Sequence, residues 1–216
     1  MTSVPGVVVE QLERIGSDGG PPRAPGFGGD PSFGPARDRR VCLTGVSLGL
    51  AGILMFFMAL ASSFIVRKGT GGDWQSLTMP KILWLNTLVL LASSLAIEVA
   101  RRKLTSGDGL AAFRNWWAIT SALGTLFLGG QIVAWRELAE QGVFLATNPS
   151  SSFFYLFTAL HGAHLLFGLA ALLYVAVRAG RPAWPRRAIA AEATAIYWHF
   201  LDGLWVFLLL LLNFGR

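Results

Sequence analysis

Cysteine and histidine are almost absent from this chain of 216 residues. Cys42 is the only cysteine, and the only histidines are His161, His164 and His199. A single thiol cannot build a disulfide framework or a cysteine-based metal site. Three imidazoles can serve at most one bis-histidine haem or one small metal centre, so little metal chemistry is open to the chain.

Charge is the second shortage. Only 14% of the residues are charged, whereas a soluble globular domain carries about 25%. Hydrophobic residues make up 53% of the chain, and the mean hydropathy is +0.53. The composition therefore argues against a soluble enzyme. The net charge of +6 does not indicate a nucleic-acid partner, because the basic residues form short clusters between apolar runs instead of one solvated face.

The first 40 residues differ from the rest, since they contain 8 glycines and 6 prolines. Such a segment buries too little apolar surface to offset its ordering entropy, so residues 1–40 are expected to form a disordered tail. No apolar run follows a basic start, as it would in a signal peptide. Scattered acidic residues also make a poor transit peptide: Glu10, Glu13, Asp18 and Asp30.

Five long apolar runs follow the tail, each near the length of about 20 residues that crosses a bilayer. They predict an all-α, polytopic membrane protein, with one domain over residues 41–216 that is a bundle of five transmembrane helices. Core helices of a large soluble protein are the alternative, but five such runs leave almost no amphipathic surface. The predicted spans are 42–66, 81–103, 113–138, 152–178 and 188–214.

The basic residues are divided unequally between the two sides of the predicted membrane. The tail and the second and fourth loops hold 13, and the opposite segments hold 5. Because cytoplasmic loops carry the excess of lysine and arginine, the N-terminus is predicted to be cytoplasmic and the C-terminus outside. Glu98 precedes Arg101 and Arg102 by three and four residues, which predicts an interfacial ion pair.

Small and polar residues inside the spans are typical of contacts between membrane helices. Gly45 and Gly49 form a small-xxx-small pair in the first span. Asn86 lies in the second span together with Thr87, Ser93 and Ser94, and Gln131 lies in the third. We interpret these residues as helix-packing positions.

Ionisable residues at membrane depth need a partner or a function. His161 and His164 are spaced three apart and are expected to share a face of the fourth helix, and His199 and Asp202 do the same on the fifth. The two pairs are expected at similar depth, so we hypothesise that Asp202 accepts a hydrogen bond from one of these histidines. A metal held by the four side chains is the alternative.

Three ordered motifs are similar to those of one family, cytochrome c oxidase subunit III. The segment from Tyr197 to Phe207 resembles its last-helix signature, Trp-His-Phe-x-Asp-x-x-Trp, and includes Trp198. The segment from Phe153 to Gly168 resembles its Phe-Phe and His-Gly-x-His motif. Leu85 to Ser93 resembles its Leu-Asn-Thr segment, and the region of Gln131 resembles its mid-helix glutamine.

The resemblance implies a subunit of a respiratory haem–copper terminal oxidase, which reduces oxygen to water and pumps protons. Such a subunit packs on subunit I, associates with subunit II and other oxidase subunits, and holds phospholipid. It binds no haem or copper, which belong to partner subunits, and no catalytic residue is expected here. The chain is similar to the five-helix form of the bacterial plasma (inner) membrane. The matching residues are then interpreted as lipid or assembly residues: His161, His164, Trp198, His199 and Asp202.

Two other functions stay open at this point. A related subunit associated with nitric oxide reductase shares the five-helix pattern. A stand-alone membrane metalloprotein would use His161, His164, His199 and Asp202. The family also has a buried carboxylate in its counterpart of residues 42–66, where this chain has Gly52 and no acid.

Overall fold

The computed structural model describes residues 35–70, 72, 74, 80–106, 109–179 and 187–214. By compactness the chain divides into two units, Met1–Asp38 and Arg39–Arg216. Residues 1–34, which carry most of the predicted tail, lie outside the described residues. In the first unit, the structure describes only the beginning of one helix.

The described residues contain five helices and no strand, and each helix is long and apolar enough to cross a membrane. This confirms the predicted fold class, an all-α polytopic membrane protein. The helices are α2 (Pro35–Thr70), α3 (Ile82–Thr105), α4 (Leu110–Glu140), α5 (Pro149–Ala179) and α6 (Arg187–Phe214).

Four helices begin before the predicted spans, and α4 begins at Leu110 and α6 at Arg187 instead of at residues 113 and 188. α2 begins at Pro35 and α5 at Pro149, instead of at residues 42 and 152. Proline suits the first helical position, because its missing N–H has no partner there in any case. Before α5, Asn148 Oδ1 accepts a hydrogen bond from the Ser151 N–H at 2.8 Å, and Ser151 Oγ accepts one from the Asn148 N–H at 3.2 Å. This reciprocal cap starts the helix where the sequence pattern suggested only a break.

The end of α4 shows why a glycine is needed in the α4–α5 turn. The Gly142 N–H donates to Ala139 O and the Val143 N–H donates to Leu138 O, each at 3.0 Å. Gly142 has φ +75°. This is the Schellman arrangement, which requires the left-handed region at the residue after the C-cap.

Gly142→Ala is therefore expected to lower the free energy of unfolding by about 1–2 kcal/mol, because an L side chain is strained at this φ. Gly129→Ala is the control. It lies inside α4, a Cβ there meets nothing within 4 Å, and alanine favours a helix interior. Unfolding in mixed detergent micelles would measure both. Equal effects of the two substitutions would contradict the assignment.

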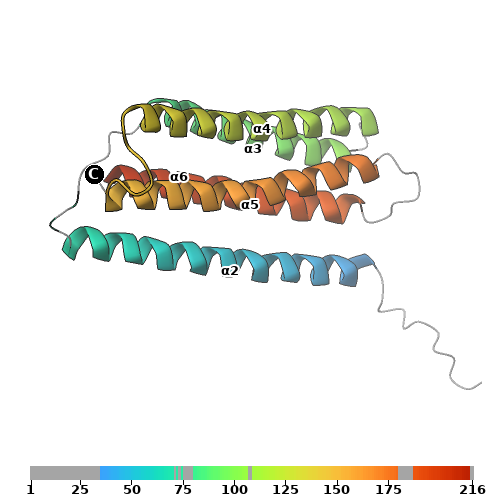
Figure 1. Cartoon of the computed structure of the whole chain (residues 1–216). Helices are drawn as coiled ribbons and strands as arrows, with labels where there is room; N and C mark the ends of the chain where they lie inside the picture. Colours follow the sequence, from blue (N-terminus) through green and yellow to red (C-terminus); the bar gives the residue numbers. More distant parts are fainter. Residues whose placement is uncertain are drawn as a thin grey trace, which may run out of the picture. The chain divides into compact units, whose positions relative to one another are not determined.

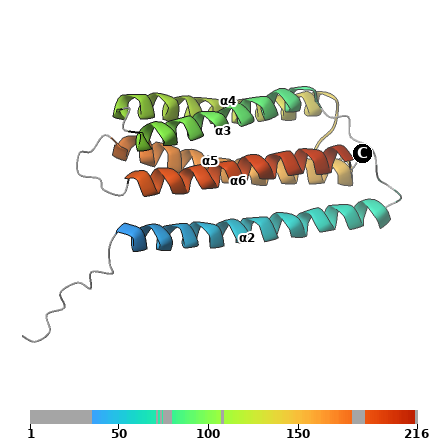
Figure 2. The ribbon, with the colours of Figure 1, turned by 180° about the vertical axis from the view of Figure 1, so that it is seen from behind.

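Helices α3, α4, α5 and α6 form a closed ring in which each helix packs against two others. The pairs in contact are α3 with α4, α4 with α5, α5 with α6, and α6 with α3. Figures 1 and 2 show these four helices side by side from opposite directions. The apolar core lies inside the ring and is rich in large aromatic side chains, including Trp117, Phe127, Trp198 and Trp205.

Helix α2 contacts the ring through long side chains. Phe57 lies against His164 of α5, with ring centroids 5.6 Å apart, and Phe64 lies 5.4 Å from Phe153 and 6.0 Å from Phe157. Arg39 pairs with Glu192 of α6. Much of the rest of α2 remains exposed, which leaves a wide apolar surface toward the membrane.

Candidate functional site

Trp198 of α6 lies at the centre of the ring and is completely buried. Its Nε1–H donates to Ser93 Oγ of α3 at 2.9 Å. Two glycines make room for the indole: a Cβ on Gly124 of α4 would lie 2.6 Å from Trp198 Cη2, and one on Gly168 of α5 would lie 3.1 Å from Cζ3. One side chain therefore connects all four ring helices.

Asp202 is also buried in the ring, with 4% of its surface exposed. Neither carboxylate oxygen has a hydrogen-bond partner of normal geometry among the described residues. Ser94 of α3 lies beside the carboxyl group. The hypothesis that Asp202 accepts a hydrogen bond from a histidine is therefore wrong, because all three imidazoles have other environments.

His199 points to α3, away from the ring interior. Its Nδ1 lies 2.5 Å from Ser94 Oγ, and its Nε2 lies 4.0 Å from Glu98 Oε2. Glu98 accepts hydrogen bonds from Arg101 Nε at 2.9 Å and from Arg102 Nε at 2.8 Å, which confirms the predicted ion pair. We call these five side chains, Ser94, Glu98, Arg101, Arg102 and His199, the α3–α6 polar face.

The two histidines of α5 diverge although they are one turn apart. His161 is fully buried between aromatic rings, with centroids 5.1 Å from Trp205 and 5.9 Å from Phe127. Neither of its nitrogens has a hydrogen-bond partner among the described residues. His164 is half-buried toward α2, and its Nδ1 lies 2.7 Å from Leu160 O. The predicted similar depth of the α5 and α6 motifs is seen in the contact of His161 with Trp205.

These positions do not form a metal site. His161 faces the ring core, His164 faces α2 and His199 faces α3. No three histidine, cysteine, aspartate or glutamate side chains gather within the described part of the chain. The spacing of three residues places the two members of each pair one turn apart on the same helix. Their side chains nevertheless point toward different neighbouring helices.

Two predicted packing residues lie inside the ring. Asn86 is buried, and a Cβ on Gly130 of α4 would lie only 2.0 Å from Asn86 Oδ1. The Asn86 side chain therefore lies directly on the Gly130 backbone, a contact that a small residue allows between membrane helices. Gln131, which follows Gly130 in α4, is also buried. Neither of its side-chain polar atoms has a hydrogen-bond partner among the described residues.

Gly45 and Gly49 lie on the outer surface of α2. A Cβ on either residue would meet nothing within 4 Å. Their predicted role in helix packing therefore stays a prediction, because neither glycine lies against another described helix.

Sequence reasoning did not identify the residues that support these side chains. The space for the Trp198 indole depends on Gly124 of α4 and Gly168 of α5. No sequence pattern indicates that these two glycines lie against the same side chain. The pair of Arg39 with Glu192 was not predicted either, and in it Glu192 Oε2 accepts a hydrogen bond from Arg39 Nε at 2.8 Å. The spacing of 153 residues between these two partners offers no local signal.

Comparisons with known proteins agree with the motifs. The sequence model of the family described as "Cytochrome c oxidase subunit III" matches residues 42–215. A Mycobacterium tuberculosis protein named "Probable cytochrome c oxidase subunit 3" is 34% identical over 181 residues, covering 80% of this chain and 87% of the relative. A Synechocystis protein named "Cytochrome c oxidase subunit 3" is 32% identical over 173 residues, covering 77% and 72%.

Proposed function

Because this chain belongs to the cytochrome c oxidase subunit III family, we propose that it is the non-redox subunit III of a respiratory haem–copper terminal oxidase. The complex reduces oxygen to water and couples the reaction to proton pumping. This chain packs on subunit I, associates with subunit II and the other oxidase subunits, and holds phospholipid. Haem and copper belong to the partner subunits, so the role of this chain is structural.

The proposal includes the orientation in the bacterial plasma membrane, with a cytoplasmic N-terminus and an external C-terminus. The excess of lysine and arginine on one side supports this orientation. Arg39, Arg101, Arg102 and Arg114 lie at the end where α2 and α4 begin and α3 ends. We call this end the basic end.

The observation that carries the proposal is the exposure of His199. Its side chain is 40% exposed, and it lies about 18 Å along α6 from Arg187, at 1.5 Å of rise per residue. A helix of 28 residues is about 42 Å long, whereas the hydrocarbon core is about 30 Å thick. His199 is therefore well inside the hydrocarbon. A polar group at that depth is costly unless protein covers it, which supports a transmembrane partner on the α3–α6 polar face.

The interior of the ring supports a structural role. Its indole N–H groups donate to side-chain and backbone oxygens of neighbouring helices: Trp198 to Ser93, Trp205 to Thr87 at 3.0 Å, and Trp117 to Leu172 O at 2.8 Å. Such interhelical hydrogen bonds hold membrane helices in one register. The ring then presents a rigid outer surface to a partner.

Purification of the full chain from its native membrane in mild detergent, through a tag, tests the proposal. Mass spectrometry is expected to identify a haem–copper subunit I in equal amount, and a reduced-minus-oxidised spectrum is expected to show its haem. Absence of such a subunit would overturn the proposal. Recovery of a nitric oxide reductase would assign the chain to the related subunit instead.

His199→Leu tests whether the α3–α6 polar face contacts subunit I. We expect it to reduce the recovery of subunit I about tenfold, because a buried polar partner left unpaired costs about 1–3 kcal/mol. Thr125→Val is the matched control, since Thr125 is an exposed polar residue of α4 whose hydroxyl donates to Ser121 O of the same helix, and it should retain the partner. Equal recovery from both variants would place the contact with subunit I elsewhere on the chain.

A further inference from the structure

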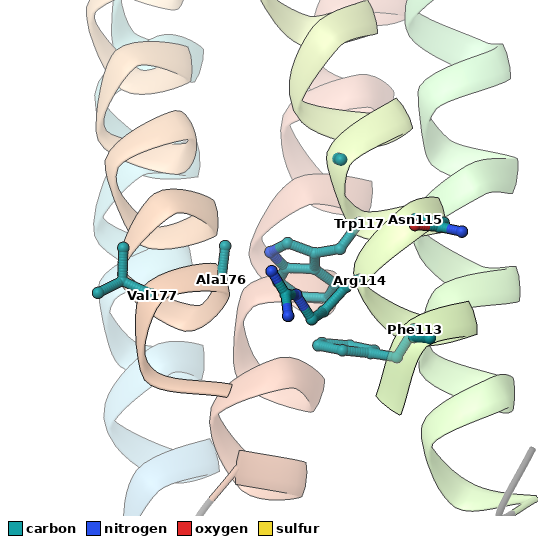
Figure 3. A pocket seen from close by; sticks show the side chains of 8 residues that line it. Phe113, Arg114, Asn115, Trp117, Ala176 and Val177 are labelled. Carbon is teal, nitrogen blue, oxygen red and sulfur yellow. The ribbon is translucent and has the colours of Figure 1, made fainter. Parts of the chain in front are cut away.

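A hollow of about 490 Å³ lies between α4 and α5 at the basic end. Figure 3 shows Phe113, Arg114 and Trp117 on α4, with Ala176 and Val177 across from them on α5. The lining also includes Ala111, Asn115 and Ala118. Three alanines leave the space open, and aromatic rings and one cation form its other sides.

The walls of this pocket are held in place by the core. Trp117 is almost fully buried, and its Nε1–H donates to Leu172 O of α5 at 2.8 Å. Phe113 packs against it with ring centroids 4.9 Å apart. The pocket is therefore formed before any ligand enters, which reduces the ordering entropy of binding.

Arg114 is the charged group of the pocket. Other arginines at this end have partners, such as Arg101 and Arg102 with Glu98. Among the described residues, Arg114 has neither an ion pair nor a hydrogen bond. It lies about 6 Å along α4 from Leu110, at the level where the headgroups of lipids meet the hydrocarbon.

We propose that this pocket binds an anionic phospholipid, with its phosphate at Arg114 and an acyl chain along the α4–α5 groove. A guanidinium matches two phosphate oxygens with paired N–H donors. Val177 is 62% exposed and lies two residues before the end of α5. The pocket therefore opens at the level of the lipid headgroups, where its mostly apolar lining suits an acyl chain, which a soluble anion lacks. The inference deepens the lipid retention in the proposed function by assigning it a site.

Photolabelling tests the site in the purified full complex. The probe is phosphatidylglycerol with a diazirine on one acyl chain, and peptide mass spectrometry locates the label. We expect labelling of residues 111–118 and 172–177, reduced about tenfold by Arg114→Gln and retained by Arg114→Lys. Arg136→Gln is the matched control, because Arg136 lines a different pocket toward the other end of the same helix. Ala118→Phe, which fills the hollow without changing its charge, is expected to prevent labelling.

Each other outcome has a separate meaning. Labelling of Arg114→Gln or Ala118→Phe equal to wild type would overturn the site while leaving the oxidase assignment intact. Equal labelling by a phosphatidylcholine analogue would overturn the preference for an anionic lipid. Crosslinks to another protein at residues 111–118 would show that a subunit fills the pocket. Expected labelling in a chain that recovers no haem-containing subunit would support the site and overturn the proposed function.

Discussion

Trp198→Ala is expected to lower the free energy of unfolding by about 3–5 kcal/mol, the range for removing a large buried aromatic side chain. Trp198 is completely buried and touches α3, α4 and α5. Its removal leaves a cavity bounded by Gly124 and Gly168, which have no side chains to fill it. The expected result is a large loss of stability in detergent, measured by unfolding in mixed micelles.

Two further variants separate the indole ring from its N–H group. Trp198→Phe keeps much of the ring but leaves Ser93 Oγ without its donor, so a loss of about 1–3 kcal/mol is expected. Trp84→Ala is the control for tryptophan removal, since Trp84 is half exposed on α3. An effect of Trp84→Ala as large as that of Trp198→Ala would contradict the central position of Trp198.

Asp202→Val is expected to raise the free energy of unfolding by about 1–3 kcal/mol, the desolvation penalty of a buried polar group that lacks partners. Both carboxylate oxygens lack a hydrogen bond of normal geometry among the described residues. Ser94 keeps its contact with His199 Nδ1 after the substitution. The same unfolding assay measures the change.

Asp202→Asn is the comparison of equal volume, and it should change stability less, because the amide remains buried and polar. A loss of more than 1 kcal/mol in the valine variant would mean that the carboxyl group makes a stabilising bond in the native membrane. The family motif would then mark a structural hydrogen bond instead of an assembly position.

Much of the fold could be predicted because the bilayer imposes simple requirements on the chain. A span needs about 20 apolar residues, and this requirement located all five helices. The pair of Glu98 with Arg101 and Arg102 was predictable for a similar reason, since residues three and four apart are neighbours on any helix. The early start of α5 was missed because Pro149 was read as part of a break and not as a first helical residue. The early start of α2 was missed because residues 35–40 were counted in the glycine- and proline-rich tail.

The candidate site was only partly predictable. The sequence singled out His161, His164, His199 and Asp202 as polar residues within the predicted spans, but it did not identify their partners. The spacing predicted which residues share one side of a helix, but it did not predict contacts between helices. The side chain within hydrogen-bond distance of His199 is Ser94, not Asp202. The pocket at Arg114 had no signal at all in the sequence, because it depends on alanines of two helices that lie opposite each other.

The sequence by itself determined the membrane-spanning class, the approximate spans and the family, since these depend on composition and on motifs within single segments. Only the tertiary structure decided that Trp198 fills a notch between Gly124 and Gly168, that His199 lies on an exposed polar face, and that Asp202 is buried without a histidine partner. The physical reason is that helical periodicity sets the direction of a side chain relative to its own helix. The packing of the ring decides which neighbour, or which lipid, lies in that direction.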